Sequence, residues 1–116
     1  MIKYKEKSKK LLYLSHPFTT GDMKKNIKHA TKCLYELTNR YKKDYVIISP
    51  IHAYGTLDGQ LNYEDGLDLC IDLLSKCDAI VMAGDYFTSR GCKEELEYAL
   101  RNKLEVFNYA DMVKTK

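Results

Sequence analysis

Short apolar runs alternate with longer stretches of helical periodicity along this chain, and this alternation constrains its fold more than any other feature. Strand-sized apolar runs are found at residues 11–14, 45–48, 79–83 and 105–107. Between them, apolar residues recur at spacings of three and four, which predicts amphipathic helices. These helices are expected over about residues 22–42, 67–77 and 89–102. Residues 50–62, with their two glycines, are expected to form a loop.

Strands that alternate with helices predict an α/β protein with a parallel sheet and helices on both faces. Right-handed crossovers then give a doubly wound, flavodoxin- or Rossmann-like sheet of four to five strands, with its switch point between the first and third strands. Ligands bind beyond the carboxyl ends of the strands at such a point. The segments expected there are 15–21, 84–91 and, after the second strand, 50–52.

The length of 116 residues indicates one domain, which we expect to span residues 11–116 after a polar lead-in at 1–10. No apolar run reaches the length of a membrane span or of a signal-peptide core, so a cytoplasmic protein is expected. The net charge of +3 comes mostly from lysines near the N-terminus. Because the chain has few arginines, a nucleic-acid surface is not expected.

Cysteine and histidine show no metal-ligand spacing in the sequence. The cysteines are Cys33, Cys70, Cys77 and Cys92, and the histidines are His16, His29 and His52. Burial is expected for Cys33, Cys70 and Cys92, which fits core thiols. Neither a metal site nor a cofactor is predicted.

Glu95 is the strongest candidate for a catalytic residue. In the helix expected from about Ser89, it lies on the apolar stripe, three residues after Cys92 and four before Ala99. The dipole near the helix N-terminus favours the ionised form of such a carboxylate, which can then act as a nucleophile. A glutamate that only complements the helix dipole is the alternative.

Tyr13 is the expected partner of Glu95, because its neighbours are apolar and a buried hydroxyl needs a hydrogen-bond partner. His52 follows the second strand and could contact a base, or could be a satisfied loop histidine. The loop from Ser15 to Gly21 offers hydroxyls and amides before a helix, which suits an anion or a sugar. It contains no phosphate-loop or dinucleotide fingerprint.

Three motifs also resemble the nucleoside 2-deoxyribosyltransferase superfamily, and in particular its small uncharacterised bacterial and phage members. They are Tyr-x-Ser-x-Pro-Phe from Tyr13, Ser-Pro-x-His from Ser49, and Ser-x-Gly-x-x-x-Glu from Ser89 to Glu95. The likeness runs from about Leu11 to Phe107. It implies that a glutamate attacks the anomeric carbon of a nucleoside or nucleoside 5'-monophosphate and displaces the base with retention.

Transferred to this chain, the resemblance makes Glu95 the nucleophile and Tyr13 the residue that orients it. The resemblance and the strand-end positions together predict contacts with the substrate at Ser15, His16, Pro17, Phe18, His52, Gly84, Asp85, Ser89, Arg90 and Gly91. Small nucleoside or nucleotide ligands are the expected partners. Homo-oligomers are implied as well, with a neighbouring chain closing each site.

One position departs from the superfamily pattern. Cys70 stands eight residues before Asp78, where these enzymes carry an aspartate that helps to hold the sugar and handle the leaving base. Asp68 and Asp72 are expected to face away, whereas Asp65 could reach the site from the helix start. A non-catalytic module that senses or sequesters an ADP-ribose-like ribonucleotide therefore stays open as the alternative to an enzyme.

Overall fold

The computed structural model describes residues 9–114 and has a four-stranded, entirely parallel sheet with the order β2-β1-β3-β4. The strands are β1 (Lys10–Ser15), β2 (Tyr45–Ile48), β3 (Ala79–Met82) and β4 (Glu105–Asn108). The long helices are α1 (Met23–Tyr41), α3 (Tyr63–Leu74) and α4 (Arg90–Arg101). This order reverses direction between β1 and β3, so the predicted doubly wound fold and its switch point are confirmed.

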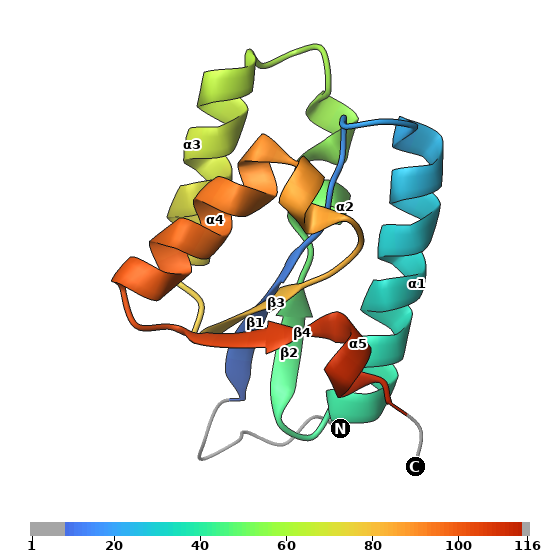
Figure 1. The fold of residues 1–116 in the computed structure, drawn as a ribbon, viewed down its shortest axis with the longest axis vertical. Helices are drawn as coiled ribbons and strands as arrows, with labels where there is room; N and C mark the ends of the chain where they lie inside the picture. Colours follow the sequence, from blue (N-terminus) through green and yellow to red (C-terminus); the bar gives the residue numbers. More distant parts are fainter. Residues whose placement is uncertain (1–8, 115–116) are drawn as a thin grey trace, which may run out of the picture.

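Two helical layers cover the sheet, with α1 on one face and α3 and α4 on the other (Figure 1). The α1 side buries Leu12, Leu14, Cys33, Leu37, Ala79, Val81, Ala83 and Met112. The α3–α4 side buries Tyr13, Leu74, Cys77, Ile80, Met82, Cys92 and Ala99. The consecutive strand residues alternate between these two clusters, as the period of two in a strand requires.

Side-chain caps fix where the long helices begin. The Asp22 carboxylate accepts from the Lys25 amide at the start of α1, and the Asn62 side chain accepts from the Asp65 amide at α3. The Ser89 hydroxyl accepts from the Cys92 amide at α4. Each cap satisfies a backbone donor that the first helical turn leaves unpaired.

Four short helical segments were not predicted. Residues 50–62 were expected to be a loop, but α2 (Pro50–Tyr54) and the 3₁₀ turn η1 (Gly55–Leu57) occupy the first half. A second 3₁₀ turn, η2 (Tyr86–Thr88), follows β3, and α5 (Tyr109–Met112) follows β4. The side chain of Met112 from α5 completes the core on the α1 side.

The expected lead-in at 1–10 needs one correction, because Lys10 already belongs to β1. Residues 1–8 of that lead-in lie outside the described part of the chain. Within the described residues, no helix combines the length and the apolar character that crossing a membrane requires.

Candidate active site

The carboxyl end of β1 places polar side chains on both faces of the sheet. Tyr13 lies among the buried residues of the α3–α4 side, and Ser15 two residues later points the same way. His16 comes next in the chain, and its ring turns to α1, where it meets His29. One strand end therefore contributes to two different polar clusters.

Glu95 lies on the inward stripe of α4 and is only 6% exposed. The Tyr13 hydroxyl donates to its Oε2, and the Ser15 hydroxyl donates to its Oε1 over 2.8 Å. The predicted hydrogen bond between Tyr13 and Glu95 is thus present, and Ser15 is a second donor that the sequence interpretation assigned only to substrate. Each carboxylate oxygen keeps a lone pair beyond the one these hydroxyls engage.

Burial decides the protonation state of this carboxyl group. It raises the pKa of Glu95 from 4.5 to about 7, although the hydrogen bonds from Tyr13 and Ser15 act in the opposite direction. The sequence interpretation emphasised the helix dipole and an ionised carboxylate, whereas desolvation is the larger effect here. A carboxyl group that titrates near neutral pH is typical of catalytic sites.

Two thiols flank the carboxylate and stay neutral near pH 7. Burial first, and the Glu95 charge second, raise the pKa of the Cys70 thiol to about 11. Burial also raises the pKa of Cys92 to about 11. Cys92 is buried as predicted, but Cys70 is only partly buried because it borders the cavity in front of Glu95.

A cavity of about 460 Å³ opens in front of Glu95, within the range of about 300–1,000 Å³ that is usual for small-molecule sites. It is bounded by the loop after β1, by α2 and η1, and by the starts of α3 and α4. A wider hollow of about 850 Å³ lies elsewhere, near Lys10, Tyr41, Tyr45 and Phe107. Glu95 does not border that hollow, so the smaller cavity is the candidate site.

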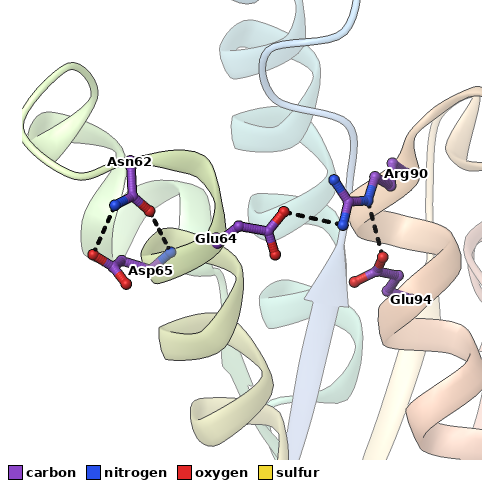
Figure 2. A network of polar contacts seen from close by, with 5 residues as sticks. All are labelled: Asn62, Glu64, Asp65, Arg90 and Glu94. Atoms are coloured by element: carbon purple, nitrogen blue, oxygen red, sulfur yellow. Dashed lines mark hydrogen bonds and ion pairs between the residues drawn. The ribbon is translucent and has the colours of Figure 1, made fainter.

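Arg90 links α3 to α4 through two ion pairs, as Figure 2 shows, and it also borders the cavity. Its guanidinium pairs with Glu64 of α3 at 3.1 Å and with Glu94 of α4 at 3.0 Å. It also lies 5.1 Å from the centre of the Tyr63 ring. These side chains are exposed, so each ion pair contributes little to stability. Both pairs nevertheless engage the Arg90 guanidinium, the group that was predicted to contact the substrate.

Only some of the predicted contact residues surround the cavity. Phe18, Ser89, Arg90 and Gly91 border it, as does His16, whose ring nevertheless points to α1. Ser15, Pro17, Gly84 and Asp85 do not border it. The Gly84 backbone instead packs against the loop after β1, where an added Cβ would lie 3.0 Å from His16 Nε2.

The predicted role of His52 in a base pocket does not fit its position. Its Nε2–H donates to Thr31 Oγ1 over 2.8 Å, since the Thr31 hydroxyl itself donates to the Ile27 carbonyl. The Ser49 hydroxyl donates to its Nδ1 over 2.6 Å. The ring is therefore fully satisfied between α1 and α2, which is the alternative interpretation that the sequence left open.

The acidic residues of α3 do not replace the missing aspartate. Asp68 and Asp72 are exposed, as predicted. The Asp65 carboxylate accepts from the Asn62 side chain at 3.0 Å and does not border the cavity, so the expectation that it reaches the site is wrong. Asp58, in the turn after η1, is the carboxylate that does border the cavity besides Glu95.

Sequence reasoning also missed the apolar wall contributed by residues 50–67. The cavity is lined there by Pro50, Ile51, Tyr54, Leu57, Leu61, Tyr63 and Leu67. A Ser-Pro pair at a helix start was the available signal, because serine caps and proline at the first helical position are typical of helix N-termini. The wall supplies a surface against which a flat apolar ligand can pack.

The sheet order defines a doubly wound α/β protein, and the switch-point cavity with its buried carboxylate is its candidate small-molecule site. A family model described as "Domain of unknown function (DUF4406)" matches residues 10–108, and the chain belongs to this family. A sequence search of curated proteins finds no match.

The fold resembles the solved structure of the 2-desoxiribosyltransferase from Leishmania mexicana, with a TM-score of 0.59 and 18% sequence identity. The match covers 85% of this chain and 63% of the other, so the present chain spans less than two thirds of that protein. At this identity the likeness establishes a shared fold.

Proposed function

We propose that this protein cleaves or transfers the N-glycosidic bond of a nucleoside or nucleoside 5'-monophosphate, with Glu95 as the nucleophile. The observation that carries the proposal is the Glu95 carboxylate itself, buried at the switch point, facing the cavity and held by Tyr13 and Ser15. The fold shared with a deoxyribosyltransferase supports the same reading.

The chemistry follows from this arrangement. A lone pair of the ionised carboxylate attacks the anomeric carbon while the bond to the base nitrogen breaks, and its electron pair leaves with the base. A second base, or water, then attacks from the face that the first base left, loses a proton to solvent and displaces the Glu95 carboxylate, so two inversions retain the configuration. Tyr13 and Ser15 are hydrogen-bonded to the carboxylate and fix its orientation, which reduces the entropic cost of attack.

A non-catalytic nucleotide-binding module is the second candidate, and Cys70 favours it. Its thiol borders the cavity beside Glu95 in place of the aspartate expected from the resemblance. A neutral thiol neither accepts strong hydrogen bonds from sugar hydroxyls nor protonates a leaving base as a carboxylic acid can. Such a site would retain a nucleotide such as an ADP-ribose-like ligand without breaking it.

Replacement of the nucleophile tests the enzymatic proposal. Glu95→Ala is expected to lower base release from nucleosides and monophosphates by at least ~10³-fold, since the substitution removes the carboxylate that forms the glycosyl-enzyme. Glu97→Ala is the matched control, because Glu97 is exposed on the same helix and pairs with Arg101. Chromatography of the released base gives the rate. Base release by Glu95→Ala at the parent rate would rule out this nucleophile.

A ligand screen separates the two candidates. Thermal shifts are measured with nucleosides, their 5'-monophosphates and ADP-ribose, and each stabilising compound is then incubated with the protein and analysed for free base. Stabilisation with base release supports the enzyme. Stabilisation in which the ligand is recovered intact supports the binding module.

A further inference from the structure

The fold brings together three side chains that are scattered in the sequence. His16 at the end of β1 and His29 and Cys33 of α1 place one potential ligand atom each within 4.8 Å of one another. Within residues 9–114 this is the one group of three or more such side chains with that spacing. No metal site was predicted from these residues, because His16 lies far from His29 and Cys33 in the sequence.

The hydrogen bonds of His16 prepare its ring for a metal ion. Its Nδ1–H donates to the Pro17 carbonyl over 2.7 Å, so the lone pair lies on Nε2. That lone pair accepts from His29 Nδ1–H over 2.7 Å. A metal-bound histidine usually donates its other ring N–H to a carbonyl or carboxylate, which fixes the tautomer, and the Pro17 carbonyl accepts in this way here.

The geometry points to a Zn²⁺ site formed by His16 Nε2, His29 Nδ1 and Cys33 Sγ. His29 and Cys33 are four residues apart on one helix, a spacing that puts two ligands on the same face. Two imidazoles and a thiolate are a ligand set that Zn²⁺ accepts, with the fourth position left for water. His29 is exposed and gives the ion a path from solvent.

The distances need only small adjustments. With Zn–N bonds of about 2.0–2.1 Å and a Zn–S bond of about 2.3 Å, tetrahedral ligand atoms lie roughly 3.3–3.8 Å apart. Cys33 Sγ is already 3.8 Å from His29 Nδ1, whereas the two ring nitrogens must separate from 2.7 Å. On binding, the proton of His29 moves from Nδ1 to its exposed Nε2, and the Cys33 thiol releases one proton to solvent.

Such an ion would act on the candidate active site through the backbone of β1. His16 is the residue after Ser15, whose hydroxyl holds Glu95 on the other face of the sheet. A metal that ties His16 to α1 fixes the strand end that carries Ser15 and the loop that carries Phe18. The site does not depend on the proposed nucleoside chemistry, because its ligands point away from Glu95.

The test uses the untagged full chain and the metal alone. Competition with a chromogenic chelator is expected to show one Zn²⁺ bound per chain, and Co²⁺ is expected to give the visible bands of a tetrahedral site together with a thiolate charge-transfer band. Cys33→Ala and His29→Ala should weaken Zn²⁺ binding by more than about tenfold and remove the charge-transfer band or the tetrahedral bands.

The controls are Cys77→Ala and His52→Ala, a buried thiol and a second histidine that lie outside the cluster. Both should bind Zn²⁺ as the parent does. Because His29 is exposed, its substitution leaves the fold intact even if Cys33→Ala does not fold. Absence of stoichiometric binding, or unchanged binding by His29→Ala, would overturn the proposal, and neither result depends on base release.

Discussion

The protonation of Glu95 decides when the proposed nucleophile is available. Because burial raises its pKa to about 7, kcat/KM for base release is expected to rise with pH through about 7 and then level off. Tyr13→Phe removes a hydrogen bond that lowers this pKa, so the midpoint should move to higher pH. Tyr98→Phe, on the same helix as Glu95, should leave the midpoint in place. A profile that falls across this range would contradict an ionised nucleophile.

The same carboxyl group makes stability depend on pH. Its folded pKa of about 7 exceeds the ordinary value of 4.5, so the folded state binds the proton more tightly than the unfolded state. The stabilising effect of that proton is present below about pH 4.5 and is lost as pH rises through 7, a change of about 3 kcal/mol. Glu95→Gln should therefore be more stable than the parent at pH 8, with little difference at pH 4. Glu97→Gln should show no such trend in urea titrations.

At the residue scale, the sequence predicts the pair Tyr13–Glu95 because both lie where burial demands a partner. It does not predict Ser15 as the second donor, although strand alternation puts Ser15 on the face of Tyr13 and His16 on the opposite face. The contact assigned to His52 failed for another reason. Its partners Thr31 and Ser49 come from separate elements, whose packing no local pattern specifies.

At the scale of the elements, the strands and the helices α1 and α4 follow from periodicity and caps. The helix α3 spans Tyr63–Leu74 and not the expected 67–77, because the Asn62 cap starts it one turn earlier. Asp22 and Ser89 precede α1 and α4 as their side-chain caps, and both helices end within one residue of the expected position. The short segments α2, η1 and α5 contain too few residues for a period of 3.6 to be read. The apolar wall of the cavity, to which α2 and η1 contribute, therefore could not be predicted from the sequence.

Alanine substitutions at two glycines are expected to change the free energy of unfolding in opposite directions. Gly84 follows β3 with a φ of +65°, and a Cβ there would lie 3.0 Å from His16 Nε2 and 3.2 Å from Pro17 Cδ. Gly84→Ala should lower the free energy of unfolding by about 1–2 kcal/mol. Gly66 lies within α3 with open space around it, so Gly66→Ala should raise that free energy by up to ~1 kcal/mol. Urea unfolding measures both. Equal effects of the two substitutions would contradict the role given to Gly84.

At the scale of the whole molecule, apolar side chains remain exposed around the cavity. Three residues that line the cavity, Leu57, Leu61 and Tyr63, are 40%, 43% and 47% exposed. Phe87, which precedes α4 in the sequence, is 64% exposed. Three other aromatic side chains outside the sheet, those of Tyr54, Tyr86 and Tyr109, are partly buried.

These exposed residues support the prediction of a homo-oligomer in which a neighbouring chain covers the cavity mouth and buries at least ~1,000 Å² per pair. Light scattering at micromolar concentration should give a mass of at least twice 13.5 kDa. Leu61→Asp should reduce the mass to that of one chain, because a charge would be desolvated at the interface. A parent protein that scatters as a monomer would remove the shared site.

The opposite orientations of Ser15 and His16 limit how this protein can be re-engineered. A residue inserted within β1 would shift every following side chain to the other face of the sheet. The serine would then leave Glu95 at the same moment as the histidine left α1, so a single insertion would disable two sites that share no side chain. Libraries built on this scaffold should therefore vary residue types along β1 and confine changes of length to a turn such as 42–44, which lies between α1 and β2 and does not border the cavity.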